Sequence, residues 1–398
     1  MRVERYRGNM FRKPIYRQFR RASVFSAILL AGYLAVFLLI LLDLWNGATP
    51  RIGFDFSIFY TALIDAKLHG TGVLFDFDHF NEGHEGIAGQ INAQKIGVPS
   101  PVFYMLIWPF TKLPFGLALI AFMIANLLAW GAAIRLAWPQ LDWRGFLLPF
   151  ASGYMFFSLA FGQAGGFLAF LLIGAFYFRY RGLHRWAGFC GAGLLIQPQF
   201  LPMIPVLFVL SHNKRALWSF LISLTVIFGL SMAIFGMEGW ISYVHSWQDY
   251  VGFIDESKRY RFMGSAFAFF TALDAPLWLS LLGHSVIVAL GVLIFKCLWA
   301  TGLASHQFVG FILAAYMIAP WPAHFDMVAL VLPAIVLMRL LPLEQRINWR
   351  FAIVFYWLAP FFAASLYTET GLAIYPLAVL LLFAASSVVI CRKSKDVV

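Results

Sequence analysis

Long apolar segments, separated by short polar or basic turns, make up most of this chain of 398 residues. The first runs from Ala22 to Leu42, and about twenty such residues cross a hydrocarbon layer of ~30 Å as a helix. Further apolar segments follow at residues 101–113, 115–137, 146–161, 164–178, 187–196, 200–210, 216–235, 277–297, 307–320, 327–340, 351–366 and 372–390. The pattern predicts an all-α polytopic membrane protein with about twelve transmembrane helices.

The composition favours a membrane protein over a soluble one. Hydrophobic residues make up 62% of the chain and charged residues only 12%, whereas soluble domains average about 25% charged residues. Eight Lys and Arg side chains against one acid lie in residues 1–21, directly before the first apolar segment. The positive-inside rule assigns such a cluster to the cytoplasm. The net charge of +11 therefore reflects membrane orientation, and we expect no nucleic-acid partner.

Basic stretches divide the chain into a cytoplasmic and an outer side. The stretches assigned to the cytoplasm are residues 1–21, 179–185, 212–215 and 339–350 and the tail 391–398. Residues 22–390 then form a single multi-pass domain in the inner (plasma) membrane. Its two large outer loops are residues 44–100 and 236–276, and most of the acids fall in outer stretches.

Two regions leave the helix count open. Residues 187–210 lie between two basic turns and contain Pro198, which indicates two short helices broken at the proline. Such breaks are tolerated only inside protein or beside a wet cavity. Residues 101–113 are either re-entrant or continuous with the helix that follows.

Asp55 is a single carboxylate in an aromatic stretch after the first apolar segment, RIGFDFSIFYTAL over Arg51–Leu63. A carboxylate partly removed from water gains proton affinity, which suits a general base. The alternative is an N-cap for a helix over Ser57–Leu68. The local sequence alone favours the cap.

Three more polar residues lie in predicted outer stretches. Gln163, in FGQAGG, either anchors a ligand or hydrogen-bonds another helix. His324 and Asp326, in PAHFDM, lie at the outer mouth of a helix, where ionisable residues are functional candidates by default. Capping of the following helix is an equally good interpretation of Asp326.

Lys258, Arg259 and Arg261 form a cationic cluster in the outer stretch DESKRYR, where the positive-inside rule disfavours cations. The cluster suggests an anionic ligand such as a phosphate, and the alternative is a loop whose mixed charges neutralise one another. The sequence contains no CxxC pair, HExxH motif or Walker A motif. We therefore expect no metal and no cofactor.

Several short motifs follow one another in a characteristic order. They are Asp55-Phe56…Tyr60, the Pro-led segment Ser100–Pro114, Asn126, Gly162-Gln163, Ala187–Gln199, Asn213–Trp218 and His324–Pro333. The series resembles glycosyltransferase family 87, a family of GT-C membrane enzymes that includes polyprenyl-phosphate-mannose-dependent α-mannosyltransferases. The similarity covers most of residues 50–335.

The resemblance implies a GT-C-type bundle of about twelve transmembrane helices, with juxtamembrane helices in the first outer loop. It implies an active site on the outer, periplasmic or exterior, face. The partners that it implies are a polyprenyl-phosphate-linked sugar donor, a lipid or glycan acceptor and membrane lipids. A single carboxylate for attack suggests one inverting displacement.

The resemblance also assigns roles to residues. Asp55 matches the general base, His324 and Asp326 match the polar pair beside the donor phosphate, and Gln163 matches the Gln of the Gly-Gln motif. The remaining expected donor-phosphate contacts are Lys258, Arg259 and Arg261, and the further candidates are Tyr60, Gln197 and Gln199.

The chain departs from the family pattern at three places. Gln197-Pro198 stands where Lys-Pro is usual, Ala164-Gly165 where x-Asn is common, and Pro99-Ser100-Pro101 where Tyr-Pro-Pro is expected. A different donor or acceptor, or a catalytically inactive relative, therefore stays open. From another class, a lipid-carrier flippase or transporter is the alternative. The predicted clustering of ionisable residues at one face favours the enzyme.

Overall fold

The computed structural model of the protein describes residues 22–46, 52–76, 99–257, 259–341, 355–363 and 374–395. The regular elements in these ranges are α-helices and 3₁₀-helices, with one isolated bridge between Met263 and Ala323. The α-helices are α1 (Ala22–Trp45), α2 (Phe54–His69), α4 (Pro101–Ile107), α5 (Phe115–Ala137), α6 (Trp143–Leu147), α7 (Gly153–Phe161), α8 (Gly165–Tyr180), α9 (His184–Gly193), α10 (Met203–Leu210), α11 (Lys214–Ser257), α12 (Ala266–Ala272), α13 (Leu277–Ala300), α14 (Ala304–Ile318), α15 (Val331–Leu340) and α17 (Ile374–Lys395), and residues 355–363 are also helical. The 3₁₀-helices are η2 (Thr71–Phe75), η3 (Trp108–Lys112), η4 (Leu148–Phe150), η5 (Leu194–Ile196), η6 (Pro198–Phe200), η7 (Arg259–Phe262) and η8 (His324–Leu330).

The described ranges are mostly helical, which confirms the all-α part of the predicted membrane fold. Three of the described helical stretches are long and apolar enough to cross a membrane: Phe115–Ala137, Lys214–Trp247 and Leu277–Ala300. Other apolar helices, α8 and α14 among them, are shorter than these three. The number of about twelve spans stays a prediction, and the basic segment 1–21 lies outside the described residues.

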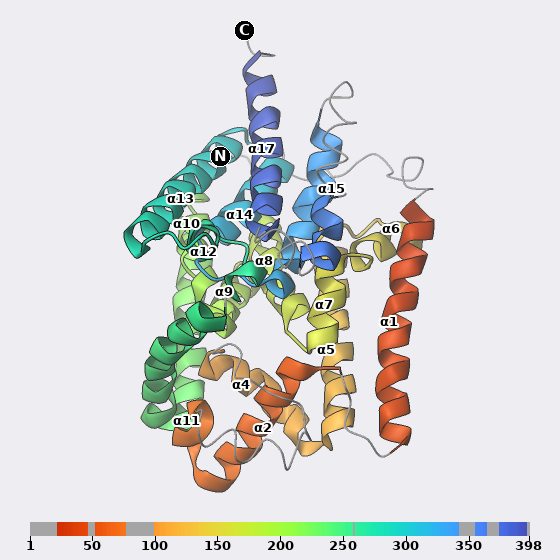
Figure 1. The fold of residues 1–398 in the computed structure, drawn as a ribbon. Helices are drawn as coiled ribbons and strands as arrows, with labels where there is room; N and C mark the ends of the chain where they lie inside the picture. The colour runs from red at the N-terminus through yellow and green to blue at the C-terminus, as the bar shows by residue number, and fades with distance from the viewer. Residues whose placement is uncertain are drawn as a thin grey trace.

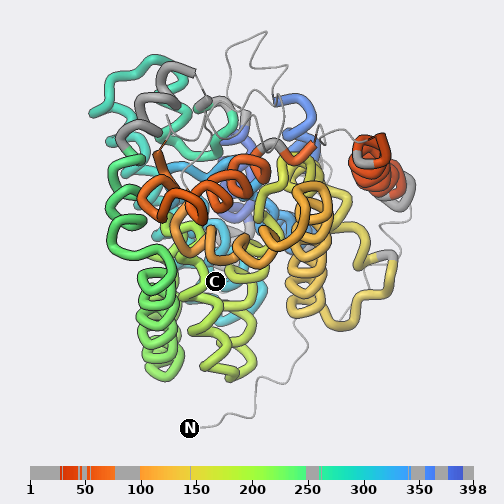
Figure 2. Tube along the Cα trace, turned by 90° about the horizontal axis from the view of Figure 1, so that it is seen from below, coloured from red at the N-terminus to blue at the C-terminus, as the bar shows by residue number. Residues whose placement is uncertain are grey.

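Helices α2 and α4 cover one end of the bundle, whereas α15 and α17 lie toward the opposite end (Figure 1). Figure 2, seen from the α2 end, shows α1 end-on at the edge of the molecule and α2 lying across the view. Part of the predicted first outer loop, residues 44–100, is therefore a helix that crosses one end of the bundle.

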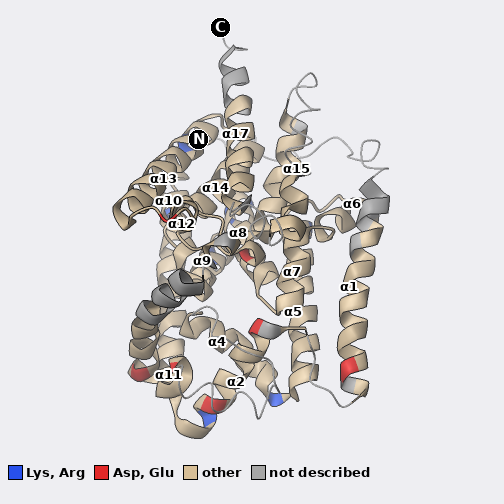
Figure 3. Ribbon diagram, in the orientation of Figure 1, with Lys and Arg blue, Asp and Glu red and all other residues tan. Residues whose placement is uncertain are grey.

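Charged side chains are sparse throughout the described bundle (Figure 3). Helices α11 and α13 instead expose many large apolar side chains, among them Leu221, Ile222, Val226, Leu230, Leu281, Leu282, Val286 and Leu293. A soluble surface rarely exposes apolar patches of this extent. These two faces therefore suit contact with lipid.

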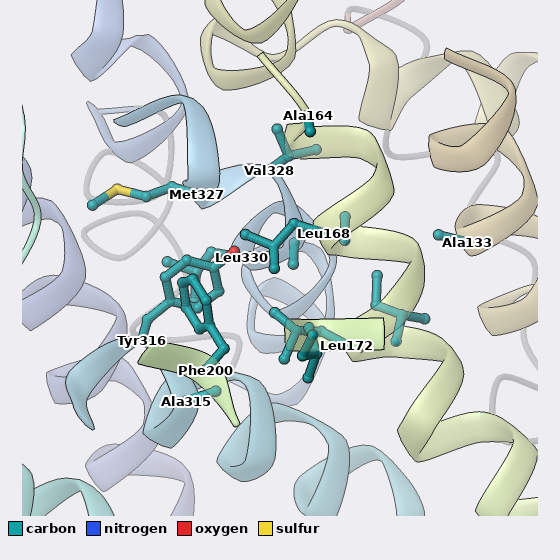
Figure 4. Packing of buried hydrophobic residues seen from close by; sticks show 14 of the residues in the cluster. Ala133, Ala164, Leu168, Leu172, Phe200, Ala315, Tyr316, Met327, Val328 and Leu330 are labelled. Atoms are coloured by element: carbon teal, nitrogen blue, oxygen red, sulfur yellow. The ribbon is translucent and has the colours of Figure 1, made fainter. Parts of the chain in front are cut away.

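The core lies where α8, α14, η6 and η8 meet. Figure 4 shows Leu168 and Leu172 of α8 beside Phe200, Tyr316 and Leu330, and all five side chains are buried. The rings of Phe200 and Tyr316 meet at a centroid distance of 5.0 Å. Phe200 belongs to the broken segment after α9, so the core anchors that segment.

Proline breaks the helices in both regions that left the count open. Pro198 follows Gln197, whose extended backbone (φ −135°, ψ 81°) separates α9 and η5 from η6 and α10, as predicted. Pro114 separates α4 and η3 from α5, so residues 101–113 are not continuous with the next helix. Proline has no N–H to donate and its ring clashes with the preceding turn, which favours a break at both places.

Helix α11 extends far beyond the apolar segment 216–235 that predicts it. Gly236, with φ 65° and ψ −179°, makes a kink, and the chain resumes helical geometry up to Ser257. Only glycine adopts this backbone conformation without strain. Much of the predicted outer loop 236–276 is therefore helical, in α11, η7 and α12.

Two glycines let α2 lie directly against the turn between α7 and α8. Gly53 and Gly162 have φ values of 88° and 72°, which favour glycine. The Gly53 N–H donates to the Ala160 carbonyl at 2.8 Å, and a Cβ on Gly162 would lie 2.5 Å from the Cβ of Phe56. The contact leaves no room for a side chain at residue 162.

We predict that Gly162→Ala destabilises the protein more than Gly182→Ala does. Gly182 has a similar φ of 75°, but an added Cβ there would have no heavy atom within 4 Å, so alanine meets only backbone strain, about 1–2 kcal/mol. Overpacking at residue 162 should add about 1–3 kcal/mol. The measurement is the apparent melting temperature of both detergent-purified variants. Equal melting temperatures would show that α2 does not pack this tightly against the turn.

Candidate active site

Asp55 lies inside the first turn of α2 and does not act as its N-cap. The helix begins at Phe54, and Gly53 occupies the N-cap position without a side-chain cap, so the predicted cap for Ser57–Leu68 is wrong. Only 2% of Asp55 is exposed. The positive end of the helix dipole favours a carboxylate at this position.

Gln163 supplies a hydrogen bond to this buried carboxylate. Its Nε2 donates to Oδ2 of Asp55 at 2.6 Å, and Gln163 is itself buried. The sequence predicts that Gln163 either anchors a ligand or hydrogen-bonds another helix. The bond to Asp55 on α2 is of the second kind. A donor to a carboxylate stabilises the charged form.

Asn126 on α5 holds the turn that carries Gln163. Its Nδ2 donates to the Gln163 carbonyl at 2.8 Å, and its Oδ1 accepts from the Gly166 N–H at 2.8 Å. Ser158 adds a second tie, since its hydroxyl donates to the Gln163 carbonyl at 3.1 Å and accepts from the Gly165 N–H at 3.0 Å. The sequence marked Asn126 as part of a motif but gave it no role, and it did not mark Ser158.

Asp326 is the second buried carboxylate of the site. Its Oδ1 accepts from Gln197 Nε2 at 2.9 Å, and its Oδ2 accepts from the Ala323 N–H at 3.0 Å. The Tyr316 hydroxyl donates to the backbone carbonyl of Asp326. The bond from Ala323 closes the first turn of η8, so Asp326 does stabilise a helix start, as one of its two interpretations predicted.

Gln197 and Gln199 join the broken segment after α9 to the connection before η8. Gln199 Nε2 donates to Gln197 Oε1 at 3.0 Å and to the Trp321 carbonyl at 3.3 Å. The Trp321 N–H donates back to Gln199 Oε1 at 3.1 Å. Ser100, in a motif that departs from the family pattern, donates to the Leu195 carbonyl at 2.6 Å and so fixes α4 beside this segment.

Aromatic rings enclose His324. Its ring stacks on Tyr375 at 5.3 Å and meets Phe157, Phe161 and Phe262 at 5.6 to 5.7 Å. Its Nδ1 is buried and has no hydrogen-bond partner in the described structure. A buried polar atom without a partner is costly, so this nitrogen is a candidate contact for a ligand.

The two carboxylates belong to one site. Asp55 and Asp326 interact electrostatically, and the turn after α7 lies directly against η8. A Cβ on Gly165 would lie 2.2 Å from the Phe325 carbonyl oxygen, and Figure 4 shows Ala164 beside Val328. Two of the predicted outer stretches, Phe161–Gly166 and Pro320–Met327, therefore meet at the start of α2.

The surroundings shift the pKa of both titratable groups of η8, which lies outside the three membrane-length helices. Burial, with a smaller contribution from Asp55, raises the pKa of Asp326 to about 7, against the opposing effect of the Ala323 and Gln197 hydrogen bonds. Burial lowers the pKa of His324 to about 4. At neutral pH His324 is therefore uncharged, and Asp326 is close to its titration midpoint.

The predicted cationic contacts are only partly described. Lys258 and the side chains of Arg259 and Arg261 lie outside the described structure. The backbone of η7 is described, and the Gly264 N–H that follows it donates to the Pro322 carbonyl at 2.8 Å. The chain that carries the arginines therefore runs beside the start of η8.

Tyr60 is buried on α2, and its hydroxyl donates to the Leu113 carbonyl at 2.8 Å. This bond attaches α2 to the connection between η3 and α5. The described contacts of Tyr60 are thus structural, and none of them joins it to Asp55 or Asp326.

A family model described as glycosyltransferase family 87 matches residues 100–320, which is more than half of the chain. The matched range contains Asn126, Gln163 and Gln197, whereas Asp55 precedes it and Asp326 follows it. No match was found among curated proteins or among solved structures.

We predict opposite pH dependences of stability for two variants of the site. Between pH 4 and 6.5, the unfolded chain holds a proton on His324 that the folded protein lacks, so this residue makes stability rise with pH. Between pH 3.8 and 7, the folded protein holds a proton on Asp326 that the unfolded chain lacks, so this residue makes stability fall with pH. The two slopes oppose each other in the wild type.

Apparent melting temperatures measured in steps from pH 4.5 to 6.5 test this. Asp326→Asn should steepen the rise with pH, and His324→Gln should turn the profile toward a fall. If both variants keep the wild-type slope, the two groups are not titrating in this way.

Proposed function

Because the chain belongs to glycosyltransferase family 87, we propose that it transfers mannose, another hexose or a pentose from a polyprenyl-phosphate donor to a lipid or glycan acceptor. The reaction takes place at the outer face of the inner membrane. The observation that carries this proposal is the buried Asp55, held by Gln163 at 2.6 Å beside a second carboxylate.

Asp55 is the general base of the proposed reaction. The acceptor oxygen attacks the anomeric carbon of the donor, its proton passes to the Asp55 carboxylate, and the bond from that carbon to the phosphate oxygen breaks. Polyprenyl phosphate leaves with the bonding electron pair. One base and a leaving group that is already good suit a single displacement, which inverts the anomeric configuration.

The donor phosphate binds near His324 and Asp326 in this proposal. His324 offers a buried nitrogen without a partner in the described structure, and Asp326, with its raised pKa of about 7, offers a hydroxyl to a phosphate oxygen when it is protonated. Lys258, Arg259 and Arg261 add positive charge from the neighbouring segment. Donors and cations placed at the leaving phosphate stabilise the charge that develops as the bond breaks.

Lipid substrates suit the surroundings of this site. Helices α11 and α13 expose long rows of apolar side chains, against which a polyprenyl tail can lie without meeting a charge. A flippase or transporter would bind the same lipids. The presence of two hydrogen-bonded pairs, Gln163 with Asp55 and Gln197 with Asp326, in one part of the bundle favours chemistry at a fixed place over movement along a path.

We predict that Asp55→Asn lowers transfer by about 10²- to 10⁴-fold, the usual contribution of a general base. Asparagine keeps an oxygen that accepts the Gln163 hydrogen bond, so the fold should survive. The matched control is Asp65→Asn, because Asp65 is a buried acid on the same helix, 3.6 Å from His69. The measurement is product glycolipid formed by purified protein from polyprenyl-phosphate-linked mannose, glucose or arabinose.

Full activity of Asp55→Asn would remove Asp55 from the mechanism. Donor movement across vesicles without any glycoside product would favour the flippase instead. Mass spectrometry of envelope glycolipids from cells lacking the protein identifies the sugar and the acceptor, as a hexose or pentose missing from one lipid.

We predict that Gln197→Lys increases transfer by lowering KM for the donor. Lysine at this position would add a cation beside Asp326, whose Oδ1 now meets only the neutral amide at 2.9 Å. Gln199→Lys serves as the control, because that side chain bonds Gln197 and Trp321 and not a carboxylate. An unchanged KM in Gln197→Lys would mean that residue 197 does not take part in phosphate binding, and transfer appearing only in this variant would identify the natural chain as an inactive relative.

A further inference from the structure

Asn126 is a fully buried amide whose hydrogen-bonding capacity is used entirely on one turn. Its Nδ2 donates to the Gln163 carbonyl at 2.8 Å and to Ser158 Oγ at 3.3 Å. Its Oδ1 accepts from the Gly166 N–H at 2.8 Å and from the Phe167 N–H at 3.2 Å. An asparagine side chain has two donor hydrogens and two acceptor sites, so all four are occupied.

The turn also touches α5 directly at its backbone. A Cβ on Gly166 would lie 2.3 Å from the Asn126 carbonyl oxygen and 2.7 Å from its Oδ1. The backbones of α8 and α5 are thus in close contact at Gly166, where Asn126 also makes its side-chain bonds. The position of the Gln163 backbone is therefore determined by α5.

Gln163 connects the fixed turn to Asp55 through its own side chain. Its backbone carbonyl is held by Asn126 and Ser158, and its side-chain Nε2 reaches Oδ2 of Asp55 at 2.6 Å. The carboxylate is 2% exposed, so water solvates it poorly, and burial alone favours its protonated form. A protonated Asp55 has no basic oxygen to receive a proton from the acceptor.

We propose that Gln163 and Asn126 are positioning residues for Asp55, which keep its carboxylate ionised and correctly oriented in an apolar bundle. The inference rests on the proposed role of Asp55 as the base. Gln163 donates the hydrogen bond that stabilises the anion and fixes the carboxylate plane. Asn126 acts through Gln163, by fixing the turn from which the amide projects.

This role differs from a contact with the donor phosphate, and the two predict different kinetics. A phosphate contact would chiefly change KM for the donor. A residue that orients and ionises the base changes kcat and the pH at which activity appears. Asp326 is the other carboxylate that interacts with Asp55, so its titration must be followed in the same experiment.

The test is Gln163→Met, which keeps the length of the side chain and removes the donor. A hydrogen bond to a charged group contributes enough that its loss should lower kcat about 10- to 100-fold. The acidic limb of the pH–rate profile should move up by about one pH unit, with KM for the polyprenyl-phosphate sugar unchanged. Gln307→Met is the control, since this amide lies on α14 and donates to the Trp299 carbonyl of α13 at 3.2 Å.

A second measurement does not depend on activity. The C=O stretch of the protonated Asp55 carboxyl appears in pH-difference infrared spectra and is assigned by its loss in Asp55→Asn; Asp326→Asn assigns the other carboxyl. The midpoint of the Asp55 band should rise by about one pH unit in Gln163→Met and stay unchanged in Gln307→Met. An unchanged midpoint in Gln163→Met overturns the proposal, even if Asp55→Asn is inactive.

Asn126→Asp tests the second positioning residue. It keeps the acceptor for the Gly166 and Phe167 N–H groups and removes both donors to the turn. Its effect on the Asp55 midpoint should vanish in the Gln163→Met background, because the two residues then act through one path. A shift that persists in the double variant is direct repulsion by the new charge and overturns the role of Asn126. Full transfer by Asp55→Asn with the expected infrared shifts would instead refute only the proposed base.

Discussion

The hydrogen bond between Gln163 and Asp55 is the interaction on which the arrangement of the site depends. An apolar helical bundle offers little water to a buried carboxylate, and an ionised group without compensation would be strongly disfavoured there. The protein must supply the donor itself. It does so in part with an amide 108 residues away in the sequence, which requires α2 and the turn between α7 and α8 to meet closely. The glycines at the meeting point and the hydrogen bonds of Asn126 follow from that requirement.

Both buried carboxylates accept hydrogen bonds from residues at places where helices are interrupted. Gln163 lies in the turn after α7, Gln197 lies between η5 and η6, and the Ala323 N–H lies just before η8. A continuous helix uses its own N–H and C=O groups internally and projects side chains sideways. A break leaves backbone donors unused and lets side chains turn into the bundle. The interruptions that complicate counting the membrane spans are therefore the parts that build the site.

Hydropathy predicts the helices well because each apolar segment must satisfy its backbone internally in lipid. The same pattern cannot predict which segments meet. Asp55 and Asp326 could be selected as unusual acids in apolar surroundings, but their partners depend on packing between distant segments. The capping signals of the sequence favour a helix from Ser57, whereas α2 begins earlier, after Gly53 in a left-handed conformation. Asn126 stood out only as part of a motif, since a lone amide in an apolar helix gives no hint of the backbone groups that it binds.

The chemical nature of the partners matters as much as their position. Asp326 meets an amide and a backbone N–H, and neither carries a charge. A lysine in place of Gln197 would hold Asp326 as an anion, and its ammonium would then meet the phosphate in place of the Asp326 hydroxyl. The amide instead leaves the carboxyl able to take up or release a proton near neutral pH, and its interaction with Asp55 couples the two titrations. If Asp326 binds the donor phosphate as proposed, the arriving negative charge favours the protonated form, and the carboxyl then donates where an anion would repel. A neutral partner at residue 197 is thus compatible with an anionic substrate, although it removes the cation that the family pattern provides.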